Sequence, residues 1–142
     1  GGTPYFLHLR RGDYVRWPTR DHPAVLPFQW YKKQMNKITE TDDRAHFIVC
    51  TDDHPYAEEY IELNPRMSIF KGSEIQDFFL MTQCSGGGIL SASTYSWWAA
   101  WYGRQFFPHS RYIAPQHWAG WRKGKWYPPA IKTSWLDYKE VC

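Results

Sequence analysis

Two adjacent arginines stand directly after a short apolar segment near the start of the chain. Residues 5–9 predict a buried β-strand, and Arg10, Arg11 and Gly12 follow it at once. A guanidinium group binds phosphate oxygens through paired hydrogen bonds, and a glycine allows a sharp turn. Asp13 cannot bind an anion but could orient one guanidinium. The pattern predicts an anion receptor, with a surface ion pair between an arginine and Asp13 as the alternative.

A second candidate anion site is a run of hydroxyl-bearing side chains before the Trp-rich segment 97–101. We expect a helix to begin there, because free backbone N–H groups at a helix N-terminus attract anions. Ordinary capping of the helix is a role that the same hydroxyls would also fill. The run consists of Ser91, Ser93, Thr94, Tyr95 and Ser96.

Three carboxylates occupy positions of interest. Asp52 and Asp53 follow an expected strand at 45–50, where they could meet a ribose hydroxyl or a metal ion. A helix N-cap is the favoured role for at least one of them. Asp77 lies on an apolar helix and could accept two hydrogen bonds from a base such as guanine. From the residues alone, the favoured position for Asp77 is a solvent-facing one.

Several other kinds of site are not supported. The six histidines lack the His-x-x-x-His spacing of a zinc site, and there is no hydrolase signature. The glycines at 86–88 precede an expected strand, so they do not form a phosphate loop. The three cysteines, Cys50, Cys84 and Cys142, suggest free thiols rather than a disulfide framework.

Short apolar strands alternate with amphipathic helices along the chain. This order predicts an α/β fold, a Rossmann-like parallel sheet with helices on both faces. Ligands of such sheets bind beyond the carboxyl ends of the strands, where the arginines and hydroxyls fall. The expected strands are 5–9, 45–50, 67–70, 89–90 and 112–114, and the expected helices start at Phe28, Pro55, Ser73 and about Ser96.

Two local expectations concern the third helix and the tail. The helix after Ser73 should carry Ile75, Phe78, Phe79 and Thr82 on one apolar side. The tail, about 115–142, is rich in Trp and Pro and basic, and should be irregular. A short final helix is expected around Leu136.

Composition limits the class of protein. The chain has 142 residues, a formal net charge of +3, 43% hydrophobic residues and 19% aromatic residues. The length suits one domain, and the small charge argues against a nucleic-acid binder. The absence of any apolar run of about 18 residues predicts no transmembrane segment.

Taken in chain order, several segments resemble the α1,2-fucosyltransferases of glycosyltransferase family 11. The segment HLRRGD at 8–13 is similar to that family's His-x-Arg-Arg-x-Asp motif. Residues 89–101 are similar to its bacterial Ser-Phe-Ser-Trp-Trp-x-Ala-Trp pattern. Residues 48–53, 77–81 and 113–118 also match. The ordered set spans nearly the whole chain and is therefore specific.

The resemblance implies a GT-B enzyme that transfers fucose from GDP-fucose to a galactoside with inversion, without a metal or cofactor. Residues 1–142 would form the donor-binding C-terminal half, and the acceptor would be a glycan with a terminal galactose. Arg10 would bind the β-phosphate, and Asp77 would receive guanine. Arg10 and Asp13 are the residues assigned to catalysis. The donor-binding residues are His8, Arg10, Arg11, Asp77, Ser93, Thr94, Tyr95 and Ser96.

The sequence departs from the family in two ways. Only seven residues precede His8, so we expect the N-terminal acceptor domain to be absent and the chain alone to be inactive. Inverting transfer needs a general base for the acceptor hydroxyl. Some relatives carry a glutamate shortly after the arginine motif, where this chain has Pro18. Asp13 and Asp21 are the remaining candidates, although Asp13 is better explained as a residue that orients arginine.

An alternative function is a non-catalytic carbohydrate-binding module, in which indole rings of the tail stack on sugars. The tryptophans in question are Trp118, Trp121, Trp126 and Trp135. The sparse cysteines and the Ser-Trp-Trp pattern favour a cytoplasmic, bacterial-type location, peripheral to a membrane at most. A Golgi-lumenal origin would require a removed anchor.

Overall fold

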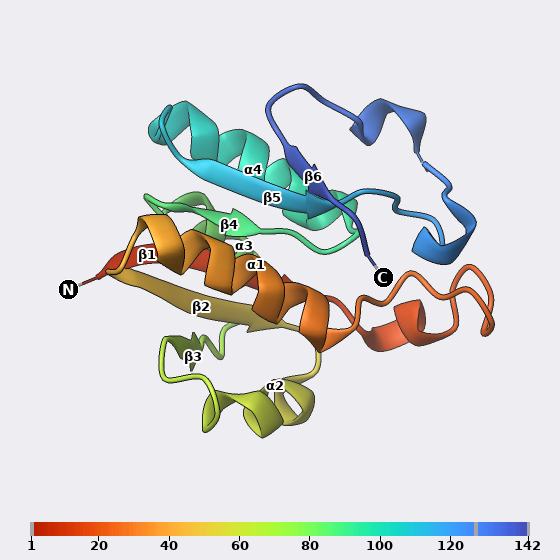
Figure 1. The fold of residues 1–142 in the computed structure, drawn as a ribbon, viewed down its shortest axis with the longest axis horizontal. Coiled ribbons are helices and arrows are strands. Elements are labelled where there is room, and N and C mark those ends of the chain that lie inside the picture. Colours follow the sequence, from red (N-terminus) through yellow and green to blue (C-terminus); the bar gives the residue numbers. More distant parts are fainter. Residues whose placement is uncertain (1, 127, 142) are drawn as a thin grey trace.

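Six parallel strands form one sheet in the order β3-β2-β1-β4-β5-β6 (Figure 1). The computed structural model describes residues 2–126 and 128–141. The strands are β1 (Thr3–Leu9), β2 (Ala45–Thr51), β3 (Met67–Ile69), β4 (Gly87–Ile89), β5 (Arg111–Pro115) and β6 (Asp137–Lys139), and the α-helices are α1 (Phe28–Thr41), α2 (His54–Ile61), α3 (Glu74–Thr82) and α4 (Thr94–Phe106).

Helices cover both faces of the sheet. Successive side chains of β1 point to opposite faces, so neighbouring residues pack against different helices. Leu7 belongs to a buried cluster with α1 and α2, which includes Ile38 and Ala57. Phe6 belongs to a second cluster with α3 and α4, which includes Met81 and Ala100. The predicted Rossmann-like α/β fold is therefore confirmed.

Short polar side chains cap the starts of α2, α3 and α4, the last through Ser93. The Asp53 carboxylate accepts the Tyr56 N–H at the start of α2. Ser73 forms a capping box with Gln76 at the start of α3. Each cap satisfies backbone N–H groups that the helix leaves free, and so it sets where the helix starts.

The strand order reverses between β1 and β4. The chain moves from β1 outward to β3 and then returns to place β4 on the other side of β1. The chain segments that leave β1 and β4 therefore run in opposite directions, and the carboxyl ends of these two strands border a crevice. This crevice is the point of the sheet at which ligands are expected.

The predicted apolar face of α3 is only partly correct. Thr82 is buried and Phe78 packs against the second buried cluster, but the other two predicted residues are exposed. Ile75 is 82% exposed and Phe79 66% exposed, whereas Asp77 and Met81 are buried. Asp77 follows Ile75 by two positions, about 200° around a helix. The Ser73 cap and the packing of α3 against α4 decide which of these sides faces the protein.

The end of the tail also differs from the expectation. In place of a helix around Leu136, β6 pairs in parallel with β5, with Asp137 opposite Ile113. The edge of β5 would otherwise present unpaired backbone groups, which a further strand satisfies. The other tail residues that the structure describes are irregular apart from two short 3-10 helices, η2 (Trp121–Lys123) and η3 (Pro129–Ile131).

The cysteine prediction is confirmed where the structure describes it. Cys50 and Cys84 are buried free thiols. Burial raises the pKa of the Cys84 thiol to about 12 and that of Cys50 further. Cys142 lies outside the described residues.

Gly88 allows β4 to pack closely against β1. A Cβ atom at this position would clash with the Phe6 ring. We predict that Gly88→Ala lowers the free energy of unfolding by about 1–3 kcal/mol, as overpacking does in other cores. Urea denaturation measures the effect. The exposed Ser85→Ala control should change stability little, and equal stabilities for the two variants would contradict the close packing.

Candidate functional site

A cleft of about 280 Å³ lies at the reversal of strand order, beyond the carboxyl ends of β1 and β2. Its walls come from the residues after these strands, from α3 and from the first residues of α4. The lining residues are His8, Arg10, Tyr14, Thr51, Asp52, Glu74, Asp77, Ser93, Thr94 and Tyr95.

Arg10 is held in the cleft by two carboxylates. Its Nη2 lies 2.8 Å from Asp13 Oδ1, and its Nη1 lies 3.5 Å from Asp52 Oδ2. The guanidinium carbon lies 5.2 Å from the centre of the Tyr14 ring. Arg10 thus forms the predicted ion pair with Asp13 and also lines the cleft. Asp13 orients the arginine rather than standing free.

Asp52 also fixes the backbone of the same turn. Its Oδ1 accepts the Arg11 N–H at 2.8 Å. Gly12 has a φ of +30°, and a Cβ there would lie 2.7 Å from Asp52 Oδ2. A glycine is required because the turn approaches this carboxylate so closely. The two acids after β2 therefore have different roles. Asp53 caps α2, and Asp52 binds the turn that contains Arg10 and Arg11.

Arg11 points away from the cleft. Its guanidinium stacks over Tyr56 of α2, 3.7 Å from the ring centre, and its Nε lies 3.3 Å from Asp53 Oδ2. These contacts attach the turn after β1 to the start of α2. Arg11 does not line the cleft, so of the two arginines only Arg10 stands where an anion in the cleft would meet it.

His8 joins the two strands that border the crevice. Its Nδ1 lies 2.7 Å from Ser91 Oγ, beyond the end of β4. Its ring centre lies 5.2 Å from that of Tyr95. Burial, together with the nearby charge of Arg10, lowers the pKa of His8 to about 3. The imidazole is therefore neutral at physiological pH and adds no charge to the cleft.

The hydroxyl-bearing residues before the Trp-rich segment have two kinds of position, some lining the cleft and others lying within the first turn of α4. Ser93, Thr94 and Tyr95 line the cleft, and Ser93 Oγ accepts the Tyr95 N–H at 3.1 Å. Ser96 is fully buried, and its hydroxyl donates to the Ser93 carbonyl at 3.0 Å. The first three side chains can thus meet a ligand, whereas Ser96 stabilises the turn beneath them.

Asp77 is the buried acid of the cleft. It is 7% exposed, so the favoured solvent-facing position is wrong. The Gly72 backbone donates a hydrogen bond to the carboxylate, but Asp77 Oδ1 has no partner among the described residues. Burial raises the pKa of Asp77, and the charge of His54 partly offsets this. A buried acceptor without a donor is costly, so Oδ1 is suited to accept from a ligand.

Sequence reasoning did not assign a binding role to three of the lining residues, Tyr14, Thr51 and Glu74. Tyr14 lies within the arginine motif, and Thr51 ends β2, where its hydroxyl donates to the Leu9 carbonyl at 2.8 Å. Asp52 was considered both as a ligand contact and as a helix cap, and it lines the cleft. Glu74 could have been found only from its spacing of three residues before Asp77, which places both on one side of α3.

Most tail tryptophans pack inward. Trp118 is 1% exposed, and Trp121 donates its indole N–H to the Val25 carbonyl at 3.0 Å. Trp135 lies against Tyr112 of β5. The exposed tryptophan is instead Trp98 of α4, at 49%. The expectation of a tail surface of exposed indoles is therefore wrong for Trp118, whereas Trp121 and Trp135 are half-buried.

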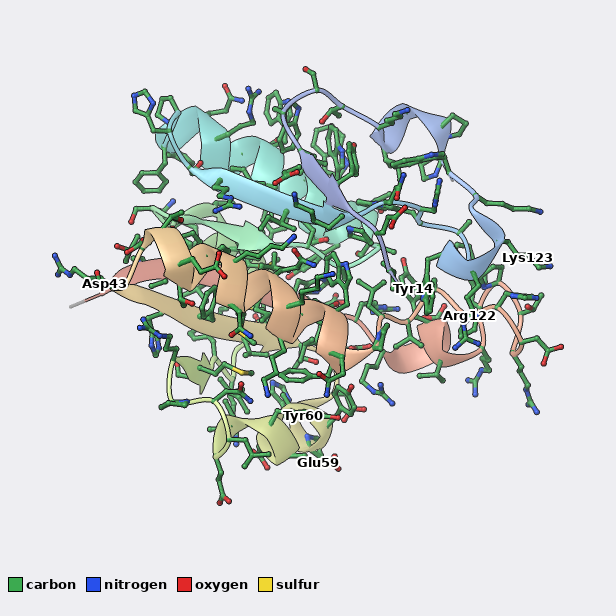
Figure 2. All side chains as sticks on the ribbon, viewed as in Figure 1. Tyr14, Asp43, Glu59, Tyr60, Arg122 and Lys123 are labelled. Atoms are coloured by element: carbon green, nitrogen blue, oxygen red, sulfur yellow. The ribbon has the colours of Figure 1, made fainter. Side chains whose placement is uncertain are left out.

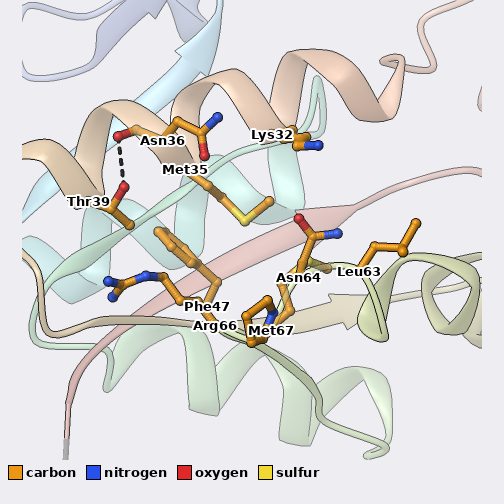
Figure 3. A pocket seen from close by; sticks show the side chains of 10 residues that line it. Lys32, Met35, Asn36, Thr39, Phe47, Leu63, Asn64, Arg66 and Met67 are labelled. Atoms are coloured by element: carbon orange, nitrogen blue, oxygen red, sulfur yellow. Dashed lines mark hydrogen bonds between the residues drawn. The ribbon is translucent and has the colours of Figure 1, made fainter.

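A second pocket, of about 260 Å³, lies between α1 and the segment from α2 to β3 (Figure 3). Met35, Phe47 and Met67 form its apolar part. Arg66 at its edge already donates to the Asp43 and Ala45 carbonyls. This pocket is near the amino ends of β2 and β3, so it is separate from the cleft.

Two absences hold for the part of the chain that the structure describes. No group of three or more His, Cys, Asp or Glu side chains lies close enough to hold a metal ion. No described helix is long and apolar enough to cross a bilayer.

The chain belongs to glycosyl transferase family 11, whose sequence profile matches residues 4–135. It is therefore of the glycosyltransferase class, as predicted. It is 36% identical over 138 residues to the O-antigen biosynthesis glycosyltransferase WbnK of Escherichia coli, covering 92% of this chain and 43% of that protein. It is 30% identical over 100 residues to the galactoside 2-alpha-L-fucosyltransferase SEC1 of Bos taurus, covering 66% and 27%.

A rabbit (Oryctolagus cuniculus) galactoside alpha-(1,2)-fucosyltransferase 2 is 28% identical over 100 residues, covering 66% of this chain and 28% of that protein. The chain thus spans less than half the length of these relatives.

The neutral His8 should make stability depend on pH. The unfolded histidine gains a proton near 6.5, whereas the folded one has a pKa of about 3. Between about pH 6.5 and pH 3 the unfolded state then binds more protons, so His8 should lower the free energy of unfolding by about 1.4 kcal/mol for each unit that the pH falls within this range. We predict that His8→Asn flattens this slope between about pH 6.5 and pH 4.5, as measured by urea denaturation. Parallel slopes for wild type and variant would contradict the burial of a neutral imidazole. The exposed His109→Asn variant is the control.

Proposed function

We propose that the cleft binds GDP-fucose and that this chain supplies the donor-binding part of an inverting α1,2-fucosyltransferase. The observation that carries the proposal is the pairing, in one cleft, of a cationic Arg10 with the unpaired, buried Asp77 Oδ1. A guanosine diphosphate has the complementary ends. The names of the SEC1 and rabbit relatives support fucose as the sugar and a galactoside as the acceptor.

The Asp77 end of the cleft suits guanine. One carboxylate can accept from the N1–H and the 2-amino group together, because these two donors are adjacent. Adenine presents no such pair on that edge. Hydrogen bonds to a charged acceptor in a buried site contribute about 1.5–3 kcal/mol each, so Asp77 would select the base.

The Arg10 end suits the diphosphate. Ser93 and Thr94 at the start of α4 bring free N–H groups and a positive helix end to the same wall as the guanidinium. In the reaction, the bond from the fucose anomeric carbon to the β-phosphate oxygen breaks, and its electron pair stays on GDP. Arg10 would stabilise this growing charge, so the proposal requires no metal ion and no cofactor.

The acceptor hydroxyl attacks the anomeric carbon from the opposite side and must lose its proton to a base. Asp13 is bound to Arg10 at 2.8 Å. We therefore propose Asp13 as a positioning residue for Arg10 and assign the base to no residue of this chain. The acceptor galactoside and a further domain that contributes to its site are parts of the same proposal.

The first test is base selection by Asp77. Calorimetry should show that wild type binds GDP about 10- to 150-fold more tightly than inosine diphosphate, which lacks the 2-amino group. Asp77→Asn should narrow this ratio, because the amide offers one acceptor atom. The ratio should also fall as pH drops through the raised Asp77 pKa, since protonation removes an acceptor.

The exposed Glu59→Gln variant on α2 serves as the control and should keep the wild-type ratio. Failure of wild type to bind GDP would refute the donor site. An unchanged ratio in Asp77→Asn would refute the role of Asp77 alone.

The second test concerns the β-phosphate. Arg10→Lys keeps the positive charge but loses the paired N–H groups with which the guanidinium can bind phosphate and both carboxylates. We predict that GDP affinity falls about tenfold while GMP affinity changes little, because GMP has no β-phosphate. Arg11→Lys should leave the GDP-to-GMP ratio unchanged, since Arg11 lies against α2. Equal effects of the two substitutions would contradict the placement of Arg10.

A further inference from the structure

A groove lies beside the donor cleft, between the loop that follows β1 and the loop that follows β5. Its volume is about 550 Å³, within the roughly 300–1,000 Å³ typical of small-molecule sites. One wall is formed by Trp17, Pro18 and Thr19. The other wall is formed by Lys123, Lys125 and Trp126.

The groove lies next to the cleft at one pair of aromatic rings. Tyr14 lines the cleft, and its ring centre lies 5.4 Å from that of Trp17, which lines the groove. Figure 2 shows Tyr14 on the same side of the molecule as Arg122 and Lys123. The groove and the donor cleft are therefore neighbours on this side of the molecule.

The two loops form a fixed unit. Trp121 of the second loop donates to the Val25 carbonyl of the first at 3.0 Å. The Lys125 carbonyl accepts the N–H groups of Trp118 and Ala119, each at 3.0 Å. The second loop can fold this tightly because Gly120 has a φ of +74°. The groove is thus formed before any ligand binds.

The chemistry of the groove combines aromatic surfaces with free positive charge. Trp17 and Trp126 are half-buried, and Lys123 and Lys125 are exposed. Neither lysine forms an ion pair with a described residue, and no acid is among the groove-lining residues. Aromatic rings stack against sugar faces, and ammonium groups attract carboxylates and phosphates.

On the basis of the proposed function, we propose that this groove binds the acceptor saccharide through a sugar unit that carries a negative charge. The charged unit lies against Lys123 and Lys125, and a neighbouring sugar face lies on Trp17 or Trp126. The saccharide then extends toward Tyr14 and the donor cleft. The groove selects an anionic saccharide over a neutral one of the same size.

The test is a titration of the 142-residue chain with three trisaccharides, each ending in galactose. One contains glucuronate, the second has neutral glucose at that position, and the third has the same glucose bearing a phosphate. The two charged trisaccharides should bind more tightly than the neutral one, and salt should weaken this preference. The indole N–H signals of Trp17 and Trp126 should shift in NMR spectra during the titration.

The matched variants are Lys123→Gln and Lys125→Gln, with the exposed Lys33→Gln on α1 as control. Each groove variant should lose about two- to fivefold in affinity for the charged trisaccharides, as expected for one exposed ion pair. The control should lose nothing, and no variant should change GDP affinity.

The outcomes separate this proposal from the donor site. If neither charged trisaccharide binds more tightly than the neutral one, or if Lys33→Gln acts like the groove variants, the groove proposal is overturned while GDP binding stands. If the charged trisaccharides are preferred and GDP does not bind, the groove is a saccharide site and the donor proposal fails.

Discussion

The carboxylate of Asp52 is the contact on which the candidate site depends. One oxygen accepts the Arg11 N–H at 2.8 Å, and the other lies 3.5 Å from Arg10 Nη1. It joins the end of β2 to the turn after β1, and so orients the guanidinium that faces the cleft. Gly12 is a consequence of this contact, because a Cβ there would lie 2.7 Å from the carboxylate.

The cleft keeps two groups in states that a stable fold would avoid. His8 is buried and neutral, with a pKa lowered to about 3, and Asp77 is a buried acid with an unpaired oxygen. Both lie where the strand order reverses, and both lose solvation without full compensation from the protein. A ligand with N–H donors would supply to Asp77 the hydrogen bonds that the protein does not.

Much of the fold could be predicted from the sequence, because alternating apolar strands and helices leave few arrangements. The position of Arg10 at a strand end was equally clear. Which side of α3 faces the protein could not be predicted, since Ile75 and Phe79 look like core residues but are exposed, whereas Asp77 is buried. The direction of Arg11 was also hidden, because its partner Tyr56 is distant in the chain. Contacts of this kind leave no local pattern in the sequence.

The sequence by itself determined the class of fold, the family and the strand-end positions of the arginine motif and the hydroxyl run, because these depend on local periodicity and short motifs. The tertiary structure alone decided which arginine faces the cleft, that Asp77 of α3 is buried, and that the loops at 17–19 and 123–126 form one groove. These depend on the approach of segments distant in the chain. Packing of α3 against α4, and of one loop against the other, sets that approach.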